Sequence, residues 1–259
     1  MSEYSRFDPK DDIRQAVIVG RYEILKFFSG KKIFIYLALV IAIFAILTTV
    51  YIMYGEDGST VQDSTSTYFS FVTLFLLIGA TLFSSVTLVS EFEERTALTL
   101  FTKPVHKSAI FLGKFVAAFL LNIAVMFVYS VLIIIVMAIS TGEFAPEIFV
   151  AFGYCTLYAF ALTGIAIFFS AIMKKSSSAS IMTFIVLLFV PSIVALVLFA
   201  AEVIENATDA WYVLDVAANS LIDCFNGPVE NGPRDALVML TWGIIPAIAS
   251  YFLFRRRQV

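Results

Sequence analysis

The stretch FVAAFLLNIAVMFVYSVLIIIVMAI, residues 115–139, contains no Asp, Glu, Lys or Arg. A helix needs roughly 20 apolar residues to cross the hydrocarbon core of a bilayer. Strands of a membrane barrel are about 10 residues long and alternate apolar with polar side chains. Residues 115–139 are longer and do not alternate. The stretch therefore predicts a membrane-spanning α-helix.

Five further segments of similar length share this depletion of charge. The six predicted spans are residues 33–54, 68–90, 115–139, 148–172, 180–201 and 236–254. All 17 bases and all 20 acids of the chain lie outside them. The chain is 60% apolar and 14% charged, whereas an average soluble domain is about 45–50% apolar and about 25% charged. We therefore expect an all-α integral membrane protein with one transmembrane domain, 1–259, and no binding to nucleic acid.

The basic residues predict the orientation of the spans. All but one of the 17 Lys and Arg residues lie in 1–32, 91–114, 173–179 or the C-terminal tail, and Arg234 is the exception. Because basic loops stay in the cytoplasm, these segments are expected to be cytoplasmic, and both termini with them. More than half of the acidic residues lie in the opposite loops.

Residues 11–30 precede the first span and predict an amphipathic helix. Ile13, Val17, Ile24 and Phe28 recur at helical spacing among basic residues. An apolar stripe with basic neighbours is typical of a helix that lies in the membrane interface. The alternative is an ordinary basic flank that only sets topology.

The last outer loop, 202–235, mixes apolar and acidic residues, which predicts short amphipathic helices that dip into the outer leaflet. Asn206 begins an Asn-Ala-Thr triplet, a candidate glycosylation site on this side. Cys224 lies in this loop and Cys155 inside the fourth predicted span, so we do not expect them to pair.

Two spans contain a proline, Pro191 in the fifth and Pro246 in the sixth. Proline removes a backbone hydrogen bond and kinks a helix, and membrane bundles tolerate such kinks. Each proline is either a hinge for alternating access or a static kink that shapes packing.

The spans offer no residues for chemistry of their own. His106 is the sole histidine, and neither an HExxH nor a GxSxG pattern occurs, so we expect no catalytic residues and no metal or cofactor site. Ion relays place charged groups at membrane depth, and no predicted span carries one. The chain also lacks a GxxxxGK[ST] phosphate-binding loop. Energy for transport would therefore come from another polypeptide.

The loop 91–114, EFEERTALTLFTKPVHKSAIFLGK, is the candidate contact for that polypeptide. Leu98 lies within an apolar run at helical spacing, and Lys103-Pro104 ends it because the residue before proline disfavours helix. A short surface helix with an apolar edge suits a groove on a partner. The alternative is a connector that rests on the lipid surface.

This loop resembles the signature of the type-2 ABC transporter permeases, which are exporter-type membrane subunits. Acidic residues are followed by Arg-Thr, leucines, Pro-Val, a basic residue and Gly-Lys before the next span. The matching residues are Glu91, Glu93, Glu94, Arg95, Thr96, Lys103, Pro104, Val105, Gly113 and Lys114. His106-Lys107 departs mildly, since the family commonly has a small residue and Arg there. The predicted layout of six spans also agrees.

The resemblance implies a mechanism and roles for these residues. Two permeases, identical or homologous, would combine with two ATP-binding subunits that use ATP and Mg, in the plasma membrane of a prokaryote. The loop would act as a coupling helix in a groove of the ATPase. The implied contact residues are Glu91, Glu94, Arg95, Thr96, Leu98, Lys103, Pro104, Lys107, Gly113 and Lys114. Of these, Glu91, Glu94 and Arg95 would fix the loop on the membrane face.

Two other classes of function stay open at this point. A membrane anchor or assembly subunit without transport would share the fold. An intramembrane enzyme or ion-coupled carrier is disfavoured by the uncharged spans. For a transporter, a cavity lined by Phe, Leu and Ile would suit a lipid, a hydrophobic peptide or a drug-like molecule.

Overall fold

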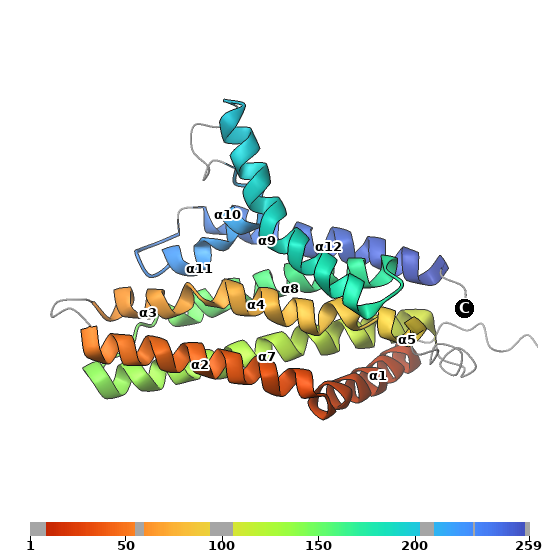
Figure 1. Cartoon of the computed structure of the whole chain (residues 1–259), viewed down its shortest axis with the longest axis horizontal. Coiled ribbons are helices and arrows are strands. Elements are labelled where there is room, and N and C mark those ends of the chain that lie inside the picture. Colours follow the sequence, from red (N-terminus) through yellow and green to blue (C-terminus); the bar gives the residue numbers. More distant parts are fainter. Residues whose placement is uncertain (1–8, 55–59, 94–105, 203–209, 230, 257–259) are drawn as a thin grey trace, which may run out of the picture.

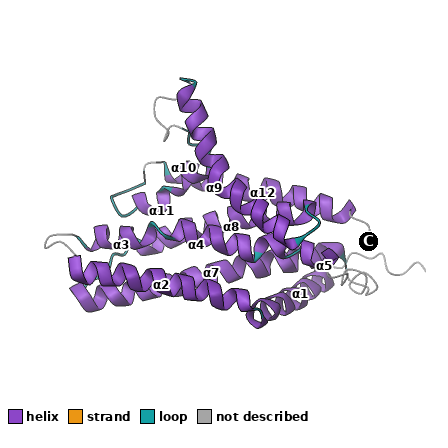
Figure 2. Cartoon of the chain, viewed as in Figure 1, coloured by secondary structure: helices purple, strands orange, loops and turns teal. Residues whose placement is uncertain are grey.

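The computed structural model describes residues 9–54, 60–93, 106–202, 210–229 and 231–256. Every regular element in these ranges is a helix (Figures 1 and 2). In chain order the helices are α1 (Pro9–Ser29), α2 (Lys31–Tyr54), α3 (Val61–Phe69), α4 (Val72–Leu82), the 3₁₀ helix η1 (Ser84–Val86), α5 (Val89–Glu93), α7 (Lys107–Thr141), α8 (Ile148–Ile172), α9 (Ser176–Ala200), α10 (Leu214–Ala218), α11 (Ser220–Asp223) and α12 (Gly232–Arg256). Six helical segments of the described chain are long and apolar enough to cross a membrane.

The six segments fall on the six predicted spans. The bounds of α8 coincide with the predicted span 148–172. The third span is longer than predicted, because α7 begins at Lys107 rather than at residue 115. Gly113 and Lys114 therefore lie inside a helix, and the connecting loop is shorter than 91–114. Helix α1 covers most of the predicted 11–30, and Gly30 separates it from α2.

The second predicted span, 68–90, corresponds to a longer helical segment, Val61–Glu93, which is irregular along its length. The second span consists of α3, α4, η1 and α5, with a break between Leu82 and Val89. The backbone amides of Leu88 and Val89 both donate to Ser170 Oγ on α8, each at 3.0 Å. Departures from regular α-helix are tolerated at membrane depth where the backbone is buried in protein, and all residues from Phe83 to Ser90 are buried.

The second and fourth spans form the centre of the bundle. In the most apolar stretch of Val61–Glu93, 72% of the residues are buried, and the value for α8 is 67%. The values for α2 and α9 are 17% and 12%. The later part of α9 extends beyond the other helices (Figure 1). The peripheral helices therefore present apolar side chains outward, as helices that face lipid do.

Tyrosine hydroxyls connect the peripheral helices to the second span. Tyr36 on α2 donates to the carbonyl of Phe75 at 3.0 Å. Tyr129 on α7 donates to the carbonyl of Tyr68 at 2.9 Å. Each bond satisfies a polar group that burial would otherwise leave unpaired.

The described residues of the loop 202–235, which we predict to be outer, include two short helices, α10 and α11. Ser220 donates to Asp235 at 2.6 Å, and the indole of Trp242 donates to the carbonyl of Tyr212 at 2.9 Å, so α12 holds this segment at two points. Cys224 is buried here, and burial raises the pKa of its thiol to about 11. Cys155 and Cys224 are unpaired, as predicted. Asn206 lies outside the described residues.

Both proline-containing spans are continuous helices. Pro191 lies within α9 and Pro246 within α12. Their role as hinges stays a prediction.

Helices α8 and α12 make backbone contact at a pair of glycines. A Cβ atom on Gly164 would lie 2.3 Å from the carbonyl oxygen of Gly243. Small residues at such crossings let membrane helices approach closely. Side chains larger than hydrogen therefore cannot be accommodated at Gly164 unless α12 moves.

We predict that Gly164→Leu separates α8 from α12 and lowers the thermal unfolding temperature of the purified protein in detergent. Overpacking typically costs about 1–3 kcal/mol, and a clash with backbone should reach the upper end of that range. The matched control is Gly153→Leu on the same helix, where a Cβ would meet nothing within 4 Å. Equal unfolding temperatures for the two variants would contradict the prediction.

Candidate functional site

A buried lysine joins three helices at one end of the bundle. Lys114 on α7 is 2% exposed. Its Nζ donates to Glu23 Oε2 on α1 at 2.7 Å and to Glu91 Oε1 on α5 at 2.8 Å. It also donates to the carbonyl of Thr87 at 3.2 Å. We call Lys114, Glu23 and Glu91 the charged cluster.

The cluster is nearly balanced in charge. A buried ion is stable only when paired and hydrogen-bonded, because the interior solvates it poorly. Lys114 offers three N–H groups, and they meet two carboxylates and one carbonyl. Lys26 supplies a second positive charge, 3.8 Å from Glu91, and reaches Ser90 Oγ at 3.4 Å. Within the part of the chain that the structure describes, two acids therefore face two bases across α1, α5 and α7.

Helices α1 and α7 cross next to this cluster through glycines. A Cβ on Gly113 would lie 2.5 Å from the carbonyl oxygen of Ala16 and 3.1 Å from the amide nitrogen of Gly20. The crossing places the neighbouring Lys114 within reach of Glu23. Gly113 is thus a point of close backbone packing between α1 and α7.

Glu93 makes a second connection from the end of the second span. Its Oε2 accepts hydrogen bonds from the backbone amide of Ser176, at 2.8 Å, and from the Ser176 hydroxyl, at 2.5 Å. Ser176 is the first residue of α9. An acidic group at a helix N-terminus satisfies free amides and complements the helix dipole. Glu93 therefore caps the fifth span from a different helix.

The structure brings together three of the residues predicted for the coupling contact, Glu91, Gly113 and Lys114. Lys107 lies at the start of α7, where its Nζ reaches the carbonyl of Arg255 at 3.4 Å. The other predicted contact residues lie outside the described residues: Glu94, Arg95, Thr96, Leu98, Lys103 and Pro104.

Glu23 is not among the residues predicted from the sequence, and it lies 91 positions from its partner Lys114. A signal existed: Gly20, Glu23 and Phe27 are spaced three and four residues apart and form the buried face of α1. An acid in line with a glycine and an aromatic residue, on a helix otherwise rich in bases, indicates a paired carboxylate. The predicted apolar stripe occupies another face, where Ile13, Val17 and Phe28 are exposed.

Six apolar spans define a multi-pass membrane protein. A family model described as ABC-2 family transporter protein matches residues 48–214, more than half of the chain, and the chain belongs to that family. It is therefore the membrane subunit of an ABC transporter, in agreement with the resemblance of the loop. A comparison with curated proteins found no match.

We predict that Lys114→Met destabilises the protein strongly. The change leaves two carboxylates in a buried site without their main partner, and breaking a buried pair costs about 3–5 kcal/mol. Thermal unfolding in detergent, followed by intrinsic fluorescence, measures the effect. The triple change Lys114→Met, Glu23→Gln and Glu91→Gln removes the stranded charges and should recover most of the loss. A triple variant no more stable than Lys114→Met would contradict an electrostatic origin.

Proposed function

We propose that this chain is the permease of an ATP-driven exporter. Two copies, or one copy and a homologous chain, combine with two ATP-binding subunits that use ATP and Mg. The complex works by alternating access in the plasma membrane of a prokaryote. Hydrolysis takes place in the partner subunits, and the permease supplies the path for an apolar substrate such as a lipid, a hydrophobic peptide or a drug-like molecule.

The distribution of charge between the two ends of the bundle supports the orientation. Lys26 and Lys114 share the carboxylate of Glu91, and Lys107 separately contacts the carbonyl of Arg255. Helices α1, α5 and the C-terminal end of α12 share one end in Figure 1. The opposite end carries Asp235 and its neighbours in α10 and α11. By the positive-inside rule the basic end is cytoplasmic.

One observation carries the proposal: Glu91 and Glu93, at the end of the second span, are hydrogen-bonded to two different parts of the bundle. Glu91 bonds to Lys114 and thereby to α7 and α1. Glu93 bonds to the start of α9. The segment that connects the second and third spans, 94–105, follows directly, so a displacement of that segment by an ATPase acts on α5 first. The two carboxylates then pass the displacement to the third and fifth spans.

The bonds in this segment suit transmission of force. Hydrogen bonds to charged groups are shorter and stronger than neutral ones, and Lys114 has no water to replace its partners because it is buried. The break in the second span, between Leu82 and Val89, separates α5 from α4. Movement of α5 is therefore not constrained by one continuous helical ladder of hydrogen bonds.

The first test is purification of the native complex and identification of its subunits by mass spectrometry. The expected result is a copurified ATP-binding subunit. The paired charge reversal Glu94→Arg with Arg95→Glu, at the predicted contact, should then uncouple ATP hydrolysis from transport. Fully retained coupling after that reversal would count against the contact. A complex that hydrolyses ATP but moves no solute would favour a membrane anchor instead.

We predict that Glu93→Gln weakens the transfer of force to α9. Ser176 donates to a carboxylate, and hydrogen bonds to an ionised acceptor are stronger than those to a neutral amide oxygen, so the ATP-driven state should be less populated in the variant. Spin labels attached at Ile139→Cys, an 81% exposed position near the end of α7, report the ATP-dependent separation of the two permeases. ATP hydrolysis itself should continue.

The control for Glu93→Gln is Glu143→Gln, an exposed acid beyond the opposite end of α7. It should leave the ATP-dependent separation unchanged. A Glu93→Gln complex whose label separation responds to ATP like the wild type would show that α9 is driven by another contact.

A further inference from the structure

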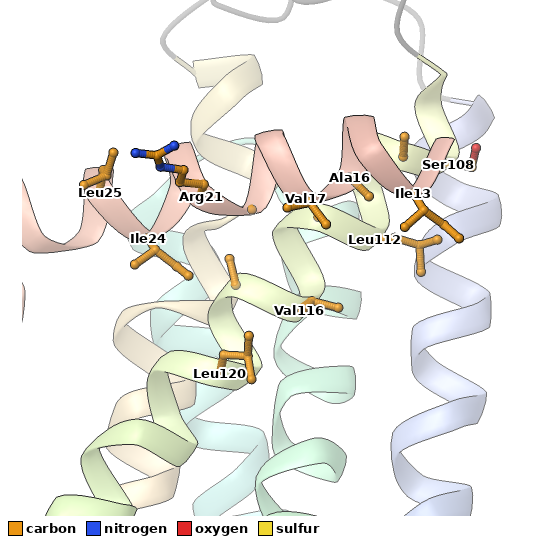
Figure 3. A pocket seen from close by; sticks show the side chains of 14 residues that line it. Ile13, Ala16, Val17, Arg21, Ile24, Leu25, Ser108, Leu112, Val116 and Leu120 are labelled. Atoms are coloured by element: carbon orange, nitrogen blue, oxygen red, sulfur yellow. The ribbon is translucent and has the colours of Figure 1, made fainter. Parts of the chain in front are cut away.

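An apolar groove lies in the angle between α1 and the first turns of α7. Its volume is about 660 Å³, within the range of about 300–1,000 Å³ that is usual for small-molecule sites. Ile13, Val17 and Ile24 line it from α1, and Leu112, Val116 and Leu120 line it from α7 (Figure 3). It is separate from the charged cluster, which lies on the buried side of α1.

The glycine crossing creates this groove. Gly20 and Gly113 both line it, and their missing side chains let the two helices touch while leaving a recess beside the contact. The apolar side chains around the recess are not covered by other parts of the described chain: Ile13 and Val17 are each 65% exposed, and Leu112 is 53% exposed. An apolar surface of this kind is expected to be occupied in the membrane.

One basic side chain lies at an edge of the groove. Arg21 is the charged residue among those that line it. In Figure 3 its guanidinium lies at the upper edge of α1, above Ile24, Val116 and Leu120. It is exposed and makes no ion pair with the described residues. The site thus combines an apolar recess with one unneutralised positive charge, and α7 continues from the recess into the membrane.

We infer that the groove binds one phospholipid with an anionic headgroup. An acyl chain fills the recess between α1 and α7, and the phosphate pairs with Arg21. This arrangement matches the two halves of a phospholipid to the two chemical parts of the site, and anionic lipids are attracted to basic residues at the cytoplasmic surface. The inference rests on the proposed function only for the orientation that makes this end cytoplasmic.

A lipid in this position has a consequence for the neighbouring cluster. It covers the crossing of Gly20 and Gly113, next to Glu23 and Lys114. A ligand that binds one arrangement of two helices stabilises that arrangement. The bound lipid therefore holds α1 against α7 and preserves the connection between the coupling segment and the third span.

The experiment is native mass spectrometry of the full-length permease in detergent, without any ATP-binding subunit. The protein is incubated with phosphatidylglycerol or with phosphatidylcholine of the same acyl chains. The wild type should retain phosphatidylglycerol about fivefold better, since one basic residue near anionic lipid contributes on that scale. Arg21→Gln should remove the preference, and Val17→Trp, which fills the recess, should reduce retention of both lipids.

Two exposed neighbours on α1 that do not line the groove provide matched controls. Arg14→Gln removes a charge and Ile18→Trp adds an indole, and both should behave as the wild type. Equal retention by Arg21→Gln and Arg14→Gln, or by Val17→Trp and Ile18→Trp, would overturn the proposal. So would a change of oligomeric state in Val17→Trp with lipid retention intact, because a second copy would then be the occupant. Loss of the ATPase partnership would leave these results unaffected.

Discussion

Lys114 is a full positive charge inside the protein, and the cost of burying it determines the arrangement of one end of the bundle. Water is not available to solvate the ammonium group, so the protein must bring acceptors to it. Glu23 comes from α1, and Glu91 and the carbonyl of Thr87 come from the C-terminal part of the second span. If either element separates from α7, Lys114 or its carboxylate partner must move into water or remain buried without an ion-pair partner. The cluster therefore acts as a constraint that three helices share.

The remaining architecture separates a central pair of spans from peripheral ones. The second span and α8 are mostly buried, whereas α2 and α9 are mostly exposed. Two contacts at the centre are close. One is the glycine pair between α8 and α12, and the other is the hydrogen bond from the amide of Leu88 to the Ser170 hydroxyl. The peripheral helices are attached to the centre through tyrosines and through the cap at Ser176.

Local composition was sufficient to predict the spans, because the depletion of charge over about 20 residues is a property of each segment alone. The family resemblance of the loop was likewise local, and the family match agrees with it. Features that depend on distant partners were not predictable. The break in the second span depends on Ser170, 82 positions from Leu88, and the pairing of Lys114 depends on Glu23, 91 positions away. A hydrophobic pattern records which side chains avoid water, but it does not record which distant polar group satisfies an amide or an ammonium.

The break between α4 and α5 divides the second span into two helical parts. The amides of Leu88 and Val89 are bonded to a side chain of α8, so α5 is attached to a neighbouring span where an unbroken helix would attach it to its own upper half. In the proposed mechanism, a displacement of α5 therefore also reaches α8, and through the glycine contact α12, besides the third and fifth spans. One stretch of chain that crosses the membrane once would then consist of a part after the break that follows the coupling segment and a part before it whose helical hydrogen bonds are separate.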